Sequence, residues 1–545
     1  MTNTPQNQLL TTLESLSRIN DTLSQDDAIT KDLNYLTEKV HNFKVIVPII
    51  GKFSSGKSTL LNRYLGENYL KTDIAPETAI ATELCYSQEE RLLIHYLDGS
   101  TPKAQELSSL ESLVIEENMA FIQVFLNNAI LKLHENIILV DMPGFDARNQ
   151  AHHQAIARYL ERGDYFISLM PIDIPFDHSI IERLAEIYFD YGKEVSCLLS
   201  KAARKSVTQR EENKQQLAKT LQDSLQTEVE VGYIETQAAN DLNMGDFERQ
   251  LDKAGNNFDA LLLDRYNPLV LEKLEHIENI IQRMRHLSEA GDIELKEQII
   301  AAQAEFKRIE ASLRSDIASF ENKLCHIGKE TLIGQAQSAL NAALPQLVTA
   351  AKSNSLNNAI AEILRPILQG QLSQLIHAEL ETLELKIGQI LTSDELNLNL
   401  SIQLPPAEKE LLLNDTISIV STVVALFFPQ HRIGKLILAA MSLFFGNRQR
   451  EEENPDALIE EQVRNEVIPQ ALNQVILHVD TEITKVAGHI KQQFMQSFAS
   501  ERNSYEKLIN DLLLEQENKQ KDYEEKHGLY TQVLKELTEL KTTLS

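Results

Sequence analysis

The stretch that decides the fold is KVIVPIIGKFSSGKSTLLNRYLG, Lys44 to Gly66. The apolar run VIVPII, residues 45–50, is typical of a buried strand, and STLLNRYL, residues 58–65, has apolar residues at helical spacing. The turn between them meets the pattern G-x-x-x-x-G-K-[ST] in full. The stretch therefore predicts a strand, a tight turn and a helix that together bind phosphate.

Each residue type in this turn has a chemical reason. Gly51 and Gly56 permit backbone conformations that are closed to other residues, so that successive N–H groups and the helix N-terminus can face phosphate oxygens. Lys57 supplies a cation and Ser58 a hydroxyl ligand for magnesium. The alternative, a solvated turn without a ligand, is disfavoured because a strand and a helix flank the motif.

A second motif follows another apolar strand, Ile137 to Val140, in ENIILVDMPGFDARNQ. In a phosphate-loop fold, Asp141 at the strand end can hold the magnesium shell, and Gly144 can donate its backbone N–H to the γ-phosphate. D-x-x-G is a weak signal alone and a strong one after a phosphate loop. ATPases of the recombination or transporter type more often close this strand with two acidic residues, whereas this chain has Met142.

The loop between the two motifs offers a threonine for the reacting phosphate. Thr78 lies in the Pro-containing segment KTDIAPETAIATELCYS and leads into an alternating strand, Ile80 to Tyr86. From there its side chain can reach magnesium and the attacking water when the loop closes. Thr72 and Thr82 are competing candidates, and a β-rich turn with incidental threonines is the plainer interpretation.

Together, GKFSSGKST, PETAIAT and VDMPGFDA resemble the bacterial dynamin-like GTPases of the dynamin superfamily, over roughly the first half of the chain. The resemblance implies an α/β P-loop GTPase domain, a mixed sheet flanked by helices, with GTP and Mg²⁺ as cofactors. It implies catalytic roles for Ser54, Lys57 and Thr78, and magnesium contacts from Ser58, Thr78 and Asp141. The implied nucleotide-binding residues are Gly51, Ser54, Ser55, Gly56, Lys57, Ser58, Thr59, Asp141, Gly144 and Lys201.

Two departures from that family pattern predict slow turnover and weak base discrimination. After the apolar strand VSCLL, the guanine-reading motif is reduced to Ser200-Lys201-Ala202-Ala203, in which Ala203 lacks the carboxylate that accepts from guanine. Classical dynamins also place Gln at the third phosphate-loop position to orient water, and this chain has Phe53. Guanine preference is therefore an expectation inherited from the family. Glu235 and Asp241 are places to look for a replacement acceptor.

From about Tyr266 onward, glycine and proline are sparse, and apolar residues recur at helical spacing with charges between them. Helices of this length cannot bury a face alone, so the pattern predicts a long all-α bundle or stalk. The resemblance implies a neck and trunk that transmit the nucleotide state; a plain bundle without motion is the alternative. The expected domains are N-terminal helices packing with the neck (1–40), a GTPase domain (41–265), neck and trunk (266–413), an apolar paddle hairpin (414–450) and returning helices (451–545).

The expected hairpin tip consists of TISIVSTVVALFF and IGKLILAAMSLFF, joined by PQHR. Each arm forms a helix of roughly 20 Å, too short to span the ~30 Å hydrocarbon core, so a re-entrant hairpin that enters one leaflet fits better. Basic residues at and after the bend can meet lipid headgroups. The alternative is a buried bundle centre or an oligomer contact. The expected membrane residues are Phe427, Phe428, Ile433, Leu436, Phe444 and Phe445.

The composition of the chain limits the kinds of partner that we expect it to bind. The net charge of −28 over 545 residues argues against a nucleic-acid partner, because phosphate contacts need clustered Lys and Arg. Three separated cysteines give neither a disulfide framework nor zinc spacing, and the N-terminus lacks a signal-peptide pattern, so we expect a cytoplasmic protein. Through the apolar hairpin, we expect it to associate peripherally with the inner face of the cell membrane.

Two functional hypotheses follow. The first is a mechanochemical GTPase that remodels membrane and assembles through its GTPase face, as a homo-oligomer or with a partner dynamin-like protein. The second is a soluble P-loop NTPase switch or scaffold with long helical arms.

Overall fold

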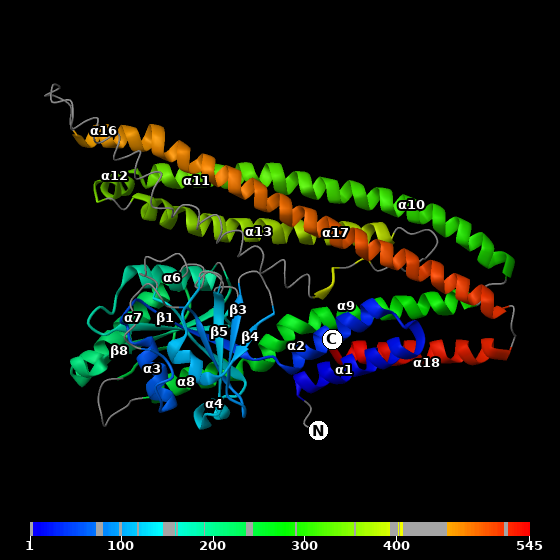
Figure 1. The fold of residues 1–545 in the computed structure, drawn as a ribbon, viewed down its shortest axis with the longest axis horizontal. Coiled ribbons are helices and arrows are strands. Elements are labelled where there is room, and N and C mark those ends of the chain that lie inside the picture. The colour runs from blue at the N-terminus through cyan, green and yellow to red at the C-terminus, as the bar shows by residue number, and fades with distance from the viewer. Residues whose placement is uncertain are drawn as a thin grey trace. The chain divides into compact units, whose positions relative to one another are not determined.

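The computed structural model divides the chain into two compact units (Figure 1). One unit is residues 42–264, and the other joins residues 1–41 to residues 265–545. The structure describes residues 4–71, 80–96, 101–116, 119–144, 159, 162–189, 191–235, 244–288, 292–353, 356–392, 402, 404–406, 455–516 and 521–544.

Residues 42–264 are built on a mixed sheet with nine strands in the described residues. The strands are β1 (Val45–Ile50), β2 (Thr82–Tyr86), β3 (Arg91–Tyr96), β4 (Lys103–Gln105), β5 (Met119–Leu126), β6 (Ile137–Asp141), β7 (Tyr165–Pro171), β8 (Glu194–Ser200) and β9 (Val231–Tyr233). Their order is β4-β3-β5-β2-β6-β1-β7-β8-β9. β1 pairs in parallel with β6 and β7, while β2 runs antiparallel to β6. β1 is thus a central strand, which explains why every residue in it is apolar and buried.

Pro48 stands inside this central strand, where a missing N–H would ordinarily break the ladder. The β1–β7 pairing begins only at Ile49. Ahead of it, the Ile46 amide donates to Asp164 Oδ2 at 2.8 Å, and the Asp164 amide donates to the Ile46 carbonyl at 2.8 Å. A Cβ at Gly163 would lie 2.7 Å from Pro48 Cγ, so glycine permits this close approach. Asp164 therefore replaces strand pairing where the proline interrupts it.

Helices flank this sheet, and apolar side chains of strands and helices share one core. They are α3 (Lys57–Leu65), α4 (Ala129–Leu133), α6 (His178–Phe189), α7 (Val207–Leu225) and α8 (Gly245–Asn256), with 3₁₀ turns η2 (Leu107–Ser112) and η3 (Ala202–Arg204). Val140 and Met170 from the sheet pack in one cluster with Leu184 of α6 and Leu221 of α7. The expected mixed sheet flanked by helices is confirmed, and the remainder of the chain is mostly helical.

The other unit is helical throughout its described elements. They are α1 (Pro5–Ile19), α2 (Asp27–His41), α9 (Phe258–Ser288), α10 (Asp292–Asn322), α11 (Lys329–Ala342), α12 (Leu344–Lys352), α13 (Leu356–Thr392), α16 (Pro455–Gln462), α17 (Ile468–Gln516) and α18 (Lys521–Leu544), with π-helical turns η1 (Asn20–Ser24), η4 (Lys323–Gly328) and η5 (Val463–Val467). α9 begins within residues 42–264 and continues into this unit.

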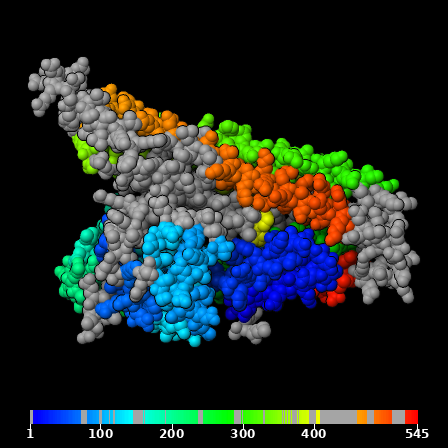
Figure 2. All heavy atoms as spheres, in the orientation of Figure 1, coloured from blue at the N-terminus to red at the C-terminus, as the bar shows by residue number. Residues whose placement is uncertain are grey.

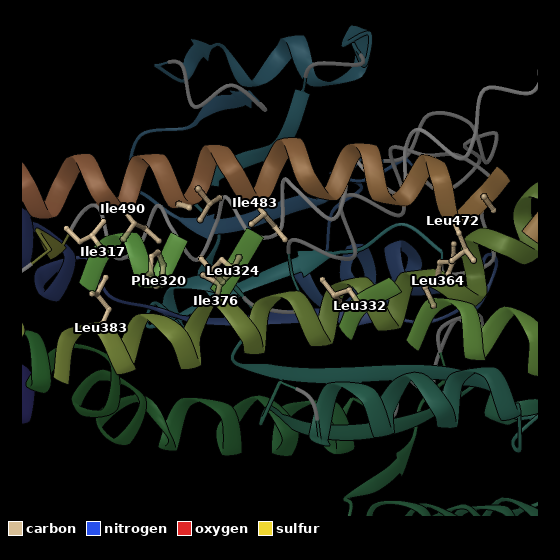
Figure 3. Packing of buried hydrophobic residues seen from close by; sticks show 14 of the residues in the cluster. Ile317, Phe320, Leu324, Leu332, Leu364, Ile376, Leu383, Leu472, Ile483 and Ile490 are labelled. Atoms are coloured by element: carbon tan, nitrogen blue, oxygen red, sulfur yellow. The ribbon is translucent and has the colours of Figure 1, made fainter. Parts of the chain in front are cut away.

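Four long helices, α10, α11, α13 and α17, pack around a continuous apolar core. Ile317, Leu332, Leu383 and Ile483, one from each helix, are all nearly inaccessible to solvent. Figure 3 shows these side chains pointing into the space between the helices. The amphipathic spacing in the sequence is what lets each helix turn one face to this core.

Helices from the two ends of the chain pack together. Arg18 of α1 forms an ion pair with Glu536 of α18. Lys273 of α9 bonds Asp32 of α2 at 2.8 Å, and Lys541 of α18 bonds Glu275 of α9 at 2.7 Å. Figure 2 shows the first helices in dark blue beside the last helix in red. Ion pairs therefore connect α1 with α18, α2 with α9 and α9 with α18.

Some expected features fall on residues that the structure does not describe. They are Thr72 and Thr78, Asp241, the hairpin 414–450 and its membrane residues Phe427, Phe428, Ile433, Leu436, Phe444 and Phe445. Among the helices that are described, none combines the length and the apolar character needed to cross a membrane.

Candidate nucleotide-binding site

The glycine-rich turn lies between central strand β1 and helix α3, as its sequence predicts. Gly51 has φ +152°, and a Cβ there would lie 2.5 Å from the Leu169 carbonyl oxygen, so glycine is required at this position. Gly56 has φ +100° and directly precedes α3. The unpaired N–H groups at the start of α3 carry partial positive charge and are suited to phosphate.

Lys57 is the first residue of α3 and is almost completely buried, at 7% exposure. Its Nζ donates to the carbonyl oxygens of Gly51, at 3.1 Å, and Lys52, at 3.0 Å. These bonds fold the side chain back over the loop, which places the ammonium among the loop's own carbonyls. A cation held there is positioned for phosphate oxygens bound by the same loop.

Ser58 and Asp141 meet where β6 ends beside β1. Ser58 Oγ donates to Asp141 Oδ2 at 2.6 Å. Burial raises the pKa of the Asp141 carboxyl, and the Ser58 hydrogen bond and the Lys57 charge oppose that shift. Asp141 Oδ1 is buried and has no hydrogen-bond partner among the described residues.

The unpaired Asp141 Oδ1 indicates whether Ser58 and Asp141 are suited to bind magnesium. A buried carboxylate oxygen without a donor is costly, and a bound cation satisfies it. Carboxylate and hydroxyl oxygens are the ligands that Mg²⁺ takes beside nucleotide phosphates. The donor set of Ser58 and Asp141 therefore fits this ion.

The other predicted nucleotide residues lie in the glycine-rich turn, in α3 or just after β6. Ser55 is buried and Ser54 is exposed, with Ser54 in the left-handed region at φ +58°. Thr59 lies in the first turn of α3 and is half-buried. Gly144 is buried, three residues beyond the end of β6. Hydrogen bonds join Lys57 to Gly51, and Ser58 to Asp141, while the roles of all the predicted nucleotide residues stay predictions.

The base-reading loop after β8 is tied to the phosphate loop. Ser200 Oγ donates to the Ser55 carbonyl at 2.8 Å, and Lys201 Nζ donates to the Ser54 carbonyl at 2.9 Å. The Ala203 amide donates to Glu235 Oε2 at 2.6 Å. The loop is therefore anchored although Ala203 itself carries no base-reading carboxylate.

Thr82, one of the competing threonines, is a strand residue. Its position in β2 pairs with Asp141 in β6, and its hydroxyl donates to the Ile80 carbonyl at 3.4 Å. Sequence reasoning did not single out two charged contacts near the site, the Lys52–Asp177 ion pair at 2.6 Å and the buried Glu83. A glutamate amid strand-forming residues is the only sequence signal for the latter.

Residues 47–202 match the sequence profile of the dynamin family. Over this stretch the chain is similar to dynamin-family proteins. A bacterial dynamin-like protein from Nostoc punctiforme is 29% identical over 166 residues, which cover 26% of this chain and 24% of that protein. The matches cover less than half the length of the first curated relatives.

Solved structures of bacterial dynamins are similar over a longer span. One belongs to an oligomerised bacterial dynamin pair, with 17% identity, coverage of 99% of this chain and 82% of the solved chain, and a TM-score of 0.42. The LeoA bacterial dynamin GTPase from ETEC is 13% identical, with 98% coverage of each chain and a TM-score of 0.31. Neither likeness is close enough to carry an argument about function.

Proposed function

We propose that the chain is a dynamin-like GTPase that binds and hydrolyses GTP with Mg²⁺. The observation that carries this proposal is the orphaned, buried Asp141 Oδ1 beside the Ser58 hydroxyl, at the head of a fully formed phosphate loop. The similarity of residues 47–202 to dynamin-family proteins supports the same reaction.

Each residue of the proposed site has a separate role in binding the nucleotide or the metal. Backbone N–H groups of the loop and Lys57 hold phosphate oxygens, and Ser58 and Asp141 hold the metal, which neutralises phosphate charge when bound. Gly144 offers a backbone N–H to the terminal phosphate, and Lys201 lies along the base. Thr78 and Ser54 are proposed to orient the attacking water, so the hydrolytic step depends on one residue of the phosphate loop and one outside it.

The test compares magnesium-dependent binding of a fluorescent GTP analogue by the parent and two variants. Lys57→Ala removes the phosphate cation and should abolish binding with the fold intact. Gly51→Ala forces a Cβ against the Leu169 carbonyl oxygen and should abolish binding because the turn has to shift. The matched controls are Lys219→Ala, on the exposed face of α7, and Gly66→Ala, which also places alanine at a positive φ (+80°) but where a Cβ meets no atom within 4 Å. Unchanged affinity in the Lys57→Ala variant would contradict the assignment.

Base preference is tested at Ala203. We expect slow turnover and a weak preference for GTP over ATP analogues in competition titrations. Ala203→Asp restores the missing acceptor and should raise the preference for guanine, whereas Ala203→Asn should do so less because its amide lacks the charge. A parent that is already guanine-exclusive means that another group supplies the acceptor, and Glu235→Gln then examines the carboxylate bonded to the Ala203 amide.

We further propose, from the sequence of residues 414–450, that the GTPase binds membrane through the apolar hairpin and couples nucleotide state to stalk rearrangement, self-assembly and remodelling. Burying each large apolar side chain contributes about 1.5–3 kcal/mol, so a few insertions outweigh repulsion between acidic protein and anionic lipid. The alternative is a soluble switch or scaffold in which the hairpin is bundle core or an oligomer interface.

The double change Phe427→Asp and Phe428→Asp separates these two functions. A membrane hairpin predicts a folded, nucleotide-binding variant that no longer sediments with liposomes. Bundle core predicts aggregation or a large fall in thermal midpoint, because unpaired buried charges are costly. Parent-like sedimentation of a well-folded variant would exclude the hairpin as the membrane contact.

A further inference from the structure

Glu83 is a charged residue in the interior of the nucleotide-binding unit. It lies in β2, between β5 and β6, and its exposure is 0%. Glutamate is depleted in strands, and removing its charge from water costs more than a partner alone returns. Apolar residues in place of such a pair are often neutral or stabilising. Packing of β2 therefore does not by itself call for a carboxylate here.

Both oxygens of the Glu83 carboxylate are occupied. Oε1 accepts from the Tyr159 hydroxyl at 2.6 Å and lies 2.8 Å from Arg162 Nη2. Oε2 accepts from Gln123 Nε2 of β5 at 2.7 Å. The Arg162 guanidinium also lies 4.2 Å from the Phe121 ring centroid. Three donors from two parts of the chain thus converge on one carboxylate.

The position of this cluster in the fold connects it to the magnesium residue. Thr82 pairs with Asp141 across the β2–β6 ladder, and Glu83 pairs with Val140. Tyr159 and Arg162 follow Gly144 further along the chain. The Glu83 carboxylate therefore links two parts of the chain. One part is Tyr159 and Arg162, which follow the second nucleotide motif, and the other is β2, which pairs with β6 at Asp141.

We propose that Glu83, held by Tyr159 and Arg162, is a positioning residue that fixes β2 against β6 and so keeps Asp141 aligned with Ser58 for magnesium. This inference rests on the proposed nucleotide site. It assigns Glu83 no contact with nucleotide or metal. Glu83 acts through the backbone pairing of β2 with β6. The measurable consequence is a change in the magnesium concentration that nucleotide binding requires.

The mildest test is Tyr159→Phe, which removes one hydroxyl and keeps the buried ring. Binding of a fluorescent GTP analogue is titrated with magnesium chloride. We expect the half-saturating magnesium concentration to rise about ten-fold, with affinity at saturating magnesium close to the parent's. Glu83→Gln should give a shift at least as large. Combining the two should add little, because both act through the same carboxylate.

The matched control is Leu217→Ala, which opens a cavity in the same core without touching the cluster. It should lower the thermal midpoint and leave the magnesium titration unchanged. A parent-like magnesium titration in Tyr159→Phe overturns the inference, as does a shift in Leu217→Ala that follows the loss of stability. A parent that binds no nucleotide at any magnesium concentration overturns the proposed function itself, which is a distinguishable result.

Discussion

Each of the two units buries a glutamate against an arginine, and the two pairs differ in their surroundings. In the sheet, Glu83 shares its oxygens among Tyr159, Gln123 and Arg162, and the Arg162 side chain keeps 29% of its surface exposed. In the helical unit, Glu501 of α17 faces Arg283 of α9, whose side chain is only 3% exposed. The first pair is partly hydrated, whereas the second is almost wholly removed from water.

The Glu501–Arg283 pair depends more strongly on charge pairing than the Glu83–Arg162 pair does. Arg283 Nη1 and Nη2 lie 3.2 and 3.1 Å from Glu501 Oε2, and His276 Nε2 lies 2.8 Å from Oε1. Burial alone would raise the pKa of the Glu501 carboxyl, but the Arg283 charge and the His276 hydrogen bond lower it to about 2. We infer that losing a partner affects stability at Glu501, whereas at Glu83 it affects the alignment of a neighbouring site.

The largest expected effect is from Arg283→Met. It leaves the Glu501 carboxylate buried without its main counter-charge, at a cost of about 3–5 kcal/mol. The thermal midpoint of the helical unit should fall while affinity for a GTP analogue stays at the parent's value. The double variant Arg283→Met and Glu501→Leu should recover most of the loss, because two apolar side chains leave no charge unpaired. No recovery would mean that packing, and not charge, dominates this contact.

Acid should affect the same contact by a slightly smaller amount. The pKa of Glu501 is depressed from 4.5 to about 2 on folding, so its contribution is complete above pH 4.5 and is lost as the pH falls toward 2. The full loss is about 3 kcal/mol. Urea unfolding between pH 5 and pH 2.5 should show this difference between the parent and Glu501→Gln. Equal pH slopes in both proteins would show that Glu501 is not the group responsible.

The smallest expected effect concerns His95, at the edge of the Glu83 cluster. Its Nε2 lies 2.7 Å from Gln123 Oε1, and burial is the main cause that lowers the pKa of this imidazole below its usual 6.5. The unfolded chain therefore binds the proton more readily, so stability should decrease as the pH falls below 6.5. Chemical unfolding of the parent and His95→Gln between pH 8 and pH 5.5 measures this slope. A parent whose stability rises on acidification in that range would contradict the assignment.

Local patterns in the sequence predicted the strand, turn and helix of the candidate site, but they did not predict the buried side-chain contacts inside residues 42–264. The strand, turn and helix around Gly51 follow from neighbouring residues, so the sequence alone locates them. The buried carboxylate of Glu83 is paired with Tyr159 and Arg162, and that of Glu501 with Arg283. These partners are distant in the chain and follow no spacing rule. The bond from the Ala203 amide to Glu235 is of the same kind. The sequence therefore did not predict hydrogen bonds and ion pairs between distant segments.

The packing of α1 and α2 against α9 and α18 has a consequence for synthesis on the ribosome. Residues 42–264 emerge in one continuous stretch and can fold as soon as they leave the exit tunnel. The Arg18–Glu536 ion pair shows that α18 covers part of α1, and this cover can form only after α18 has been made. At about 5–20 residues per second the delay to α18 is roughly 25–100 s, and during this interval the part of α1 that meets α18 stays uncovered.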